Sequence, residues 1–135
     1  MKNKAFFFDR DGVLINEVYS NNTTEPGSIH SISELIFTSQ IKELCKVLKE
    51  KFLLIMFTNQ PDIAKGKVSL KKVESINNFI KKDLELNDIY MCVCDNNNCN
   101  YRKPNAGMII KAQKEWNIDL KRSFVVGDRW KDIRA

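Results

Sequence analysis

Two aspartates separated by a single residue follow an apolar run near the start of the chain. They are Asp9 and Asp11, in the stretch FFFDRDGVLIN of residues 6–16, and Gly12 comes directly after them. Carboxylates this close repel each other. Their spacing therefore predicts a cation, a shared proton or a reaction at this place in the protein. Gly12 allows the backbone to turn sharply beside them.

Segments with the patterns of strands and helices must position these aspartates. Continuous apolar runs predict buried strands over residues 5–8, 52–57, 89–93 and 124–126, and apolar residues at helical spacing predict helices over 39–50, 69–84 and 105–116. Ser39 is expected to cap the first helix, whose apolar face comprises Ile41, Leu44, Cys45 and Leu48. The polar segments 16–33 and 95–105 are expected to be loops.

The alternation of strands and helices predicts an α/β fold with a doubly wound parallel sheet. Strands that are buried on both faces have continuous apolar runs, as these do. In such sheets, ligands bind beyond the carboxyl ends of the strands. Polar segments follow all four expected strands, at residues 9–11, 58–60, 92–103 and 127–128. We therefore expect chemically capable side chains to meet at one edge of the sheet.

Four of these segments carry a family resemblance. The motifs DRDG (9–12), TNQ (58–60), RKP (102–104) and GDRWKD (127–132) resemble, in this order, those of the haloacid dehalogenase (HAD) superfamily of phosphotransferases. Together with the cysteine-bearing loop that runs into RKPNAGM, they are similar to the branch containing D-glycero-D-manno-heptose 1,7-bisphosphate phosphatase and histidinol-phosphate phosphatase. The resemblance covers nearly the whole chain. It implies a Rossmann-like HAD fold in a single domain, residues 1–135.

The resemblance also implies a reaction, which the chemistry of the residues fits. Asp9 would attack a phosphoryl group, and Asp11 would protonate the leaving oxygen and later activate water. Thr58 would hydrogen-bond the phosphoryl oxygens, and Lys103 would stabilise the charge of the transition state. Mg²⁺ would be bound by Asp9, by the backbone carbonyl of Asp11 and by Asp128, and Asp132 would support it through water.

Substrate recognition is expected to depend on loops. Only 46 residues separate Asp11 from Thr58, which leaves no room for a cap domain. The predicted substrate-binding residues are Arg10, Asn16, Tyr19, Asn59, Gln60, Arg102 and Arg129. Among them, Arg10 and Arg102 have planar guanidinium groups that suit a second phosphate or a carboxylate. The expected partner is a small phosphorylated metabolite, in the first place a sugar bisphosphate for cell-surface polysaccharide.

Three cysteines lie within eight residues, at Cys92, Cys94 and Cys99. In a reducing compartment such a cluster indicates metal binding before disulfide formation. The resembling branch holds a structural zinc ion in a C-x-H…C-x-C loop, but here Cys94 replaces the histidine and Tyr101 replaces the last cysteine. Zinc normally takes four ligands. Water or Asp95 is an alternative fourth ligand, and loss of the metal is the other interpretation.

Composition limits the remaining possibilities. The chain is 43% hydrophobic and 29% charged, which is typical of a globular protein. It has no apolar run long enough to span a membrane and no signal-peptide pattern, so we expect a cytoplasmic protein without a membrane partner. The net charge of +5 suits an anionic ligand. Its basic residues form no stripe interleaved with aromatic residues, so a nucleic-acid partner is not expected.

The end of the sequence differs from the family pattern. GDRWKDIRA stops where the family continues with a helix and at least one more strand, so the chain is expected to be truncated at its C-terminus. The strand 124–126 would then form a bare sheet edge, which invites a homodimer. Three other functions stay open: a histidinol-phosphate phosphatase, a polynucleotide 3′-phosphatase, and a truncated remnant that binds a phosphosugar without turnover.

Overall fold

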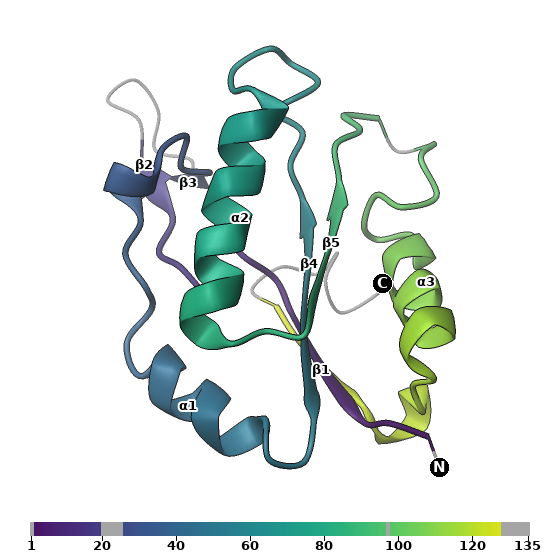
Figure 1. Cartoon of the computed structure of the whole chain (residues 1–135). Coiled ribbons are helices and arrows are strands. Elements are labelled where there is room, and N and C mark those ends of the chain that lie inside the picture. Colours follow the sequence, from purple (N-terminus) through teal and green to yellow (C-terminus); the bar gives the residue numbers. More distant parts are fainter. Residues whose placement is uncertain (1, 20–25, 97, 128–135) are drawn as a thin grey trace.

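The centre of the protein is a four-stranded parallel sheet (Figure 1). The computed structural model describes residues 2–19, 26–96 and 98–127. The strands are β1 (Ala5–Phe8), β4 (Leu53–Asn59), β5 (Asp88–Cys92) and β6 (Phe124–Val126), in the spatial order β5-β4-β1-β6. Each pair of neighbours in this sheet is parallel. The prediction of a parallel α/β sheet is confirmed.

Helices cover both faces of the sheet, so the doubly wound arrangement is confirmed as well. Figure 1 shows α1 (Ile41–Leu48) and α2 (Leu70–Leu84) on one side and α3 (Gly107–Trp116) on the other. Successive residues of a strand point to opposite faces. Phe8 therefore packs in the cluster with α1 and α2, whereas Phe7 packs in the cluster with α3. Short 3₁₀ helices occur at Ile32–Glu34 and Leu120–Arg122.

Two expectations about α1 are wrong. Gln40, not Ser39, is the N-cap, and it has a left-handed backbone (φ 64°) and no side-chain capping bond. The turn is set instead by Thr38, whose hydroxyl donates to the carbonyl of Val13 and whose carbonyl accepts from the amide of Ile41. Leu44 lies outside the core with 47% of its surface exposed. The buried stripe of this short helix is therefore narrower than its apolar spacing predicts.

The other helices differ less from expectation. Ser69 caps α2, and its hydroxyl accepts from the amide of Lys72 at 3.2 Å. The helix α3 begins at Gly107 rather than at 105. The segment 16–33, expected to be a loop, contains two short strands, β2 (Val18–Tyr19) and β3 (Pro26–Gly27), which pair in antiparallel fashion.

The strand β6 lies at one end of the sheet, as expected for a bare edge. Phe124 is 54% exposed there, and its ring stacks on Phe6 with a centroid distance of 5.0 Å. Nothing in the described residues covers this edge with a further strand. The homodimer remains a prediction. No helix in the part of the chain that the structure describes has the length and apolarity needed to cross a membrane.

Candidate active site

The carboxyl ends of three strands meet at Asp9. This residue follows β1 directly, and its amide donates to the carbonyl of Val126 at the end of β6, at 3.0 Å. Thr58 lies near the end of β4, which is the other neighbour of β1. After β1, the chain thus first forms β4 on one side of β1 and later forms β6 on the other side. Sheets of this kind place their ligands at this switch point.

Asp9 forms an ion pair with Lys103, whose side chain is buried. The ammonium group lies 3.0 Å from Asp9 Oδ1, and the lysine side chain is 2% exposed. The backbone amide of Arg10 donates to the same oxygen at 2.9 Å. The ammonium also lies 3.7 Å from the centroid of the Phe57 ring, a cation–π contact. A buried lysine at this place brings positive charge to the first carboxylate.

Asn59 holds the backbone that presents Lys103. Its side-chain oxygen accepts from the amide of Lys103 at 3.0 Å, and its side-chain nitrogen donates to the carbonyl of Lys103 at 3.4 Å. The loop also approaches α3 closely, because the amide of Gly107 donates to the carbonyl of Asn100 at 3.0 Å. A Cβ atom at Gly107 would lie 2.4 Å from that carbonyl oxygen. Only glycine therefore fits here without a shift of the loop.

Among the described residues, three side chains donate hydrogen bonds to Asp11. Arg10 donates to it through Nε and Nη2 at 3.1–3.3 Å, Gln60 through Nε2 at 2.9 Å, and Ser28 through its hydroxyl at 3.2 Å. Gln60 Nε2 also donates to the hydroxyl oxygen of Thr58 at 2.8 Å. These contacts place Asp11 and Thr58 in one hydrogen-bonded network.

Each of the two neighbouring carboxylates thus has a cation supplied by the chain. Lys103 pairs with Asp9, and Arg10 pairs with Asp11. Because these charges are opposite and close, they offset the repulsion between the aspartates. The backbone turns sharply after the pair, with Gly12 at φ 85°, a region that glycine adopts readily. Positive side chains of the protein therefore offset part of the repulsion that the spacing of the two aspartates implies.

Several of the residues predicted to bind substrate form hydrogen bonds within the protein. Arg10 is fully buried and bonds inward to Asp11, Gln60 and Asn77, so it is placed to position Asp11. Gln60 is buried in the same network. Arg102 donates through Nη1 to the carbonyl of Cys94 at 2.6 Å and so ties the cysteine loop together. These contacts show that polar side chains at the end of a strand can point into the protein rather than toward a ligand.

The remaining predicted residues are less informative. Asn16 is exposed, and its backbone amide donates to the carbonyl of Ile36. Within the described part of the chain, the Asn16 side chain makes no hydrogen bond to the carboxylate cluster. Tyr19 ends β2, where it pairs with Pro26. Asp128, Arg129 and Asp132 lie outside the described residues, and the predictions made for them stay predictions.

The three cysteines come together as expected. Their sulfur atoms all lie within 4.8 Å of one another, and the sulfurs of Cys92 and Cys99 are 3.6 Å apart. Burial raises the pKa of Cys92 to about 12. The hydrogen bond to the Cys94 thiol lowers the pKa of Cys99 to about 7. In the described chain, Asp95 falls outside this cluster.

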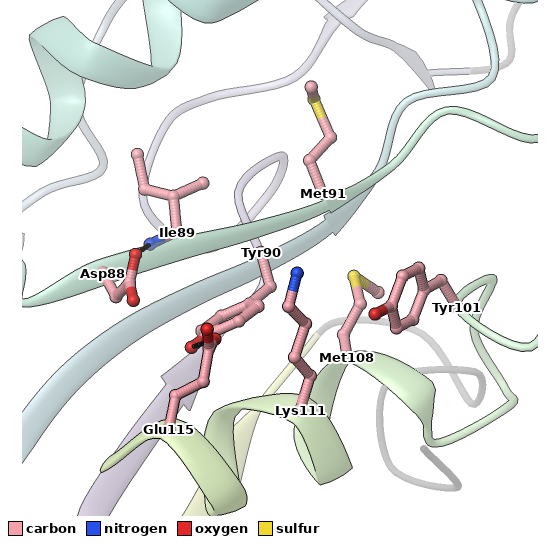
Figure 2. A pocket seen from close by; sticks show the side chains of 8 residues that line it. All are labelled: Asp88, Ile89, Tyr90, Met91, Tyr101, Met108, Lys111 and Glu115. Atoms are coloured by element: carbon pink, nitrogen blue, oxygen red, sulfur yellow. Dashed lines mark hydrogen bonds between the residues drawn. The ribbon is translucent and has the colours of Figure 1, made fainter.

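A cavity of about 280 Å³ lies apart from the carboxylates, between β5 and α3. Figure 2 shows Tyr90, Met108 and Lys111 directed toward it, with Tyr101 at one side, whereas the Met91 side chain leaves the opposite face of β5. Its acidic groups are already paired: Glu115 accepts from the Tyr90 hydroxyl at 2.5 Å, and Asp88 accepts from the Trp116 indole at 2.8 Å. We therefore centre the candidate site on Asp9 and Asp11.

Sequence reasoning missed two residues that contact this network. Asn77 lies on the buried face of α2, between Ile76 and Ile80 in the core, and accepts from Arg10. A polar residue within an apolar helical stripe is the signal that could have identified it. No sequence pattern identifies Ser28, which follows β3. Its contact with Asp11 depends on how the antiparallel pair of β2 and β3 packs against the rest of the protein.

Comparison with known proteins identifies relatives over nearly the whole chain. A family model described as "Polynucleotide kinase 3 phosphatase" matches residues 4–132. A D-glycero-alpha-D-manno-heptose-1,7-bisphosphate 7-phosphatase from Campylobacter jejuni is 35% identical over 142 residues, covering 100% of this chain and 77% of the relative. The corresponding beta-anomer 7-phosphatase from Yersinia pestis is 32% identical, covering 97% of this chain and 73% of the relative.

Solved structures show the same fold. The D,D-heptose 1.7-bisphosphate phosphatase from B. bronchiseptica, complexed with magnesium and phosphate, superposes with a TM-score of 0.80. It is 23% identical, and the match covers 97% of this chain and 73% of that one. The fold is that of the HAD-type phosphatases. The chain belongs to the polynucleotide kinase 3 phosphatase family within this superfamily.

Proposed function

We propose that this protein hydrolyses the 7-phosphate of D-glycero-D-manno-heptose 1,7-bisphosphate and releases heptose 1-phosphate and inorganic phosphate. The main support is the cluster of Asp9, Asp11, Thr58 and Lys103 at the carboxyl edge of the sheet. Whole-chain similarity to curated 7-phosphatases supports this choice of substrate. The names of these relatives include both anomers, so the proposal covers either.

In the proposed reaction, a carboxylate oxygen of Asp9 attacks phosphorus while the bond to the sugar oxygen breaks. Asp11 gives its proton to that leaving oxygen. Water then attacks phosphorus in the aspartyl-phosphate, Asp11 takes the proton of the water, and the bond to Asp9 breaks as phosphate leaves. Lys103 and Thr58 stabilise negative charge on the phosphoryl oxygens.

We also propose that Mg²⁺ is the cofactor. The Asp9 carboxylate and the Asp11 carbonyl are hard oxygen ligands of the kind that Mg²⁺ prefers, with Asp128 proposed as the third. The charges support this assignment: the two aspartates are already offset by Lys103 and Arg10, and a phosphate dianion would add two negative charges. The ion would supply the two positive charges that compensate them.

A comparison of substrates tests the proposal. Release of phosphate should be at least about 100-fold more efficient from the heptose bisphosphate than from histidinol phosphate or a 3′-phosphorylated oligonucleotide. The rate with the sugar should change little between low and high salt, whereas binding of an oligonucleotide would weaken steeply. A preference for the oligonucleotide would instead support the activity for which the family model is named.

We propose a structural zinc ion at Cys92, Cys94 and Cys99. Two thiolates on one tetrahedral zinc lie about 3.8 Å apart, given Zn–S bonds of roughly 2.3 Å. The observed 3.6 Å between the sulfurs of Cys92 and Cys99 fits this geometry. The described residues place three thiols within reach, so water is the proposed fourth ligand.

Metal analysis tests the zinc proposal. The purified protein should contain about one zinc per chain, and Cys99→Ser should lose most of it, because two thiolates bind zinc much more weakly than three. Cys45→Ala is the matched control, since Cys45 is a buried residue of α1 and lies far along the chain from the cluster. A folded wild-type protein without zinc, prepared in medium that contains zinc, would contradict the assignment.

A further inference from the structure

A chain of buried polar side chains connects α2 to Asp11. Asn77 Oδ1 accepts from Arg10 Nη1 at 3.0 Å, and Arg10 donates through Nη2 and Nε to Asp11 at 3.1–3.3 Å. Both Arg10 and Asn77 are buried, the first completely. We propose that Asn77 is a positioning residue for the reaction, acting on Asp11 through Arg10. This inference rests on the proposed role of Asp11.

The position of Asn77 in α2 is unfavourable unless its polar group is bonded. Its neighbours on the buried face of the helix are Val73, Ile76 and Ile80. A buried amide without a partner destabilises a protein, whereas a leucine would fit such a face well. The contact with Arg10, 67 residues away in the sequence, accounts for an asparagine at this place.

The geometry of Arg10 explains how Asn77 can act at a distance. A guanidinium group is planar and rigid, so fixing one of its corners fixes the direction of the others. Asn77 binds Nη1, Gln60 Oε1 accepts from Nη2 at 3.0 Å, and the edge formed by Nε and Nη2 then faces Asp11. Asn77 thereby sets the orientation of the Asp11 carboxylate.

The neutrality of the Asn77 side chain is as important as its shape. Its amide oxygen accepts a hydrogen bond without bringing a negative charge to Arg10. The positive charge of Arg10 therefore remains directed to Asp11, which is the carboxylate it pairs with in the described residues. Gln60, which is also uncharged, extends the same network to Thr58. The network can thus orient two proposed catalytic groups without adding charge to the site.

Kinetics of Asn77→Leu test this role. The leucine has a similar volume but cannot accept from Arg10. We expect kcat to fall about 10-fold with KM changed by less than about 2-fold, since a misplaced acid–base group slows the chemical steps without weakening binding. Asn78→Leu is the matched control, because Asn78 is the exposed neighbour in the same helix. It should keep wild-type kinetics.

A double-mutant cycle separates positioning from a general structural effect. In the background of Asp11→Asn, Asn77→Leu should cause no further loss of kcat, because the group that it positions can no longer transfer a proton. The same loss in both backgrounds, or no loss in either, would overturn the inference. If Asn77→Leu does not fold, Asn77→Ser serves in its place, because its side chain is polar but too short to reach Arg10.

A measurement independent of turnover completes the test. The NMR signal of the Arg10 Nε–Hε group, assigned by its loss in Arg10→Lys, should exchange slowly with water in the wild type and faster in Asn77→Leu. Unchanged exchange would overturn the inference. Absence of phosphatase activity in the wild type would refute the proposed function, and this exchange experiment would still decide whether Asn77 fixes Arg10.

Discussion

Asp9→Asn is expected to lower the rate of phosphate release by at least about 10³-fold, because an amide cannot serve as the nucleophile. The substitution is nearly isosteric, so Lys103 Nζ and the amide of Arg10 can still donate to the side-chain oxygen. The loss should therefore appear in kcat, measured as phosphate release under saturating substrate. Thermal unfolding should show that the variant remains folded.

The control for this variant is Asp83→Asn. Asp83 is on the outer face of α2, where its carboxylate pairs with Lys42 at 3.3 Å. Exposed pairs of this kind contribute little to stability, so the control should be as active and nearly as stable as the wild type. If Asp9→Asn retained more than about a tenth of the wild-type rate, its assignment as the nucleophile would have to be abandoned.

Lys103→Met is the prediction with the next largest effect. Lys103 is buried, and its ammonium lies 3.0 Å from Asp9 Oδ1. Methionine fills similar space but carries no charge, so the phosphoryl oxygens lose a cation at the point where negative charge develops. We expect kcat to fall by about 10²–10³-fold, the usual effect of removing one such group.

Two further variants sharpen this prediction. Lys111→Met removes an exposed lysine from α3 and should leave kcat unchanged. Lys103→Arg should not restore activity, because a guanidinium group is larger than the ammonium that packs against the Phe57 ring. Full activity in Lys103→Arg would show that any positive charge near Asp9 is sufficient. It would refute the expectation that activity requires an ammonium group at this position.

The sheet could be predicted well because its two central strands, β1 and β4, are buried on both faces. Runs such as Ala5–Phe8 and Leu53–Asn59 contain almost continuous apolar residues, and parallel strands under two layers of helices require that pattern. The order of the strands then brings the polar residues that follow them to one edge. For this reason the sequence alone is sufficient to group Asp9, Asp11, Thr58 and Lys103 at one edge of the sheet.

The direction of individual side chains could not be predicted in the same way. Arg10 stands between two aspartates, and its buried side chain pairs with Asp11 and also bonds to Gln60 and Asn77, which lie 50 and 67 residues later. Local sequence carries no information on partners so distant. The contact of Arg10 and Gln60 with substrate therefore stays a prediction, and the structure adds the hydrogen bonds that both donate to Asp11.

Helix faces were predicted less accurately than strands. Leu44, Leu70 and Phe79 have helical spacing with buried residues, yet all are substantially exposed. A helix that packs on one face of a sheet buries only a stripe, and apolar residues at the border of that stripe are common. The cysteine cluster was easier to predict, because three thiols within eight residues of a tight loop lie close together.

The proposed activity is that of a metal-dependent sugar phosphatase. Its most direct test is phosphate release from D-glycero-D-manno-heptose 1,7-bisphosphate by the purified protein of 135 residues, with Mg²⁺ and with EDTA. We predict release of one phosphate per substrate with Mg²⁺, leaving heptose 1-phosphate, and no release with EDTA. Equal release in EDTA would contradict the metal requirement. No release from this substrate or from an aryl phosphate, by protein shown to be folded, would contradict the phosphatase itself.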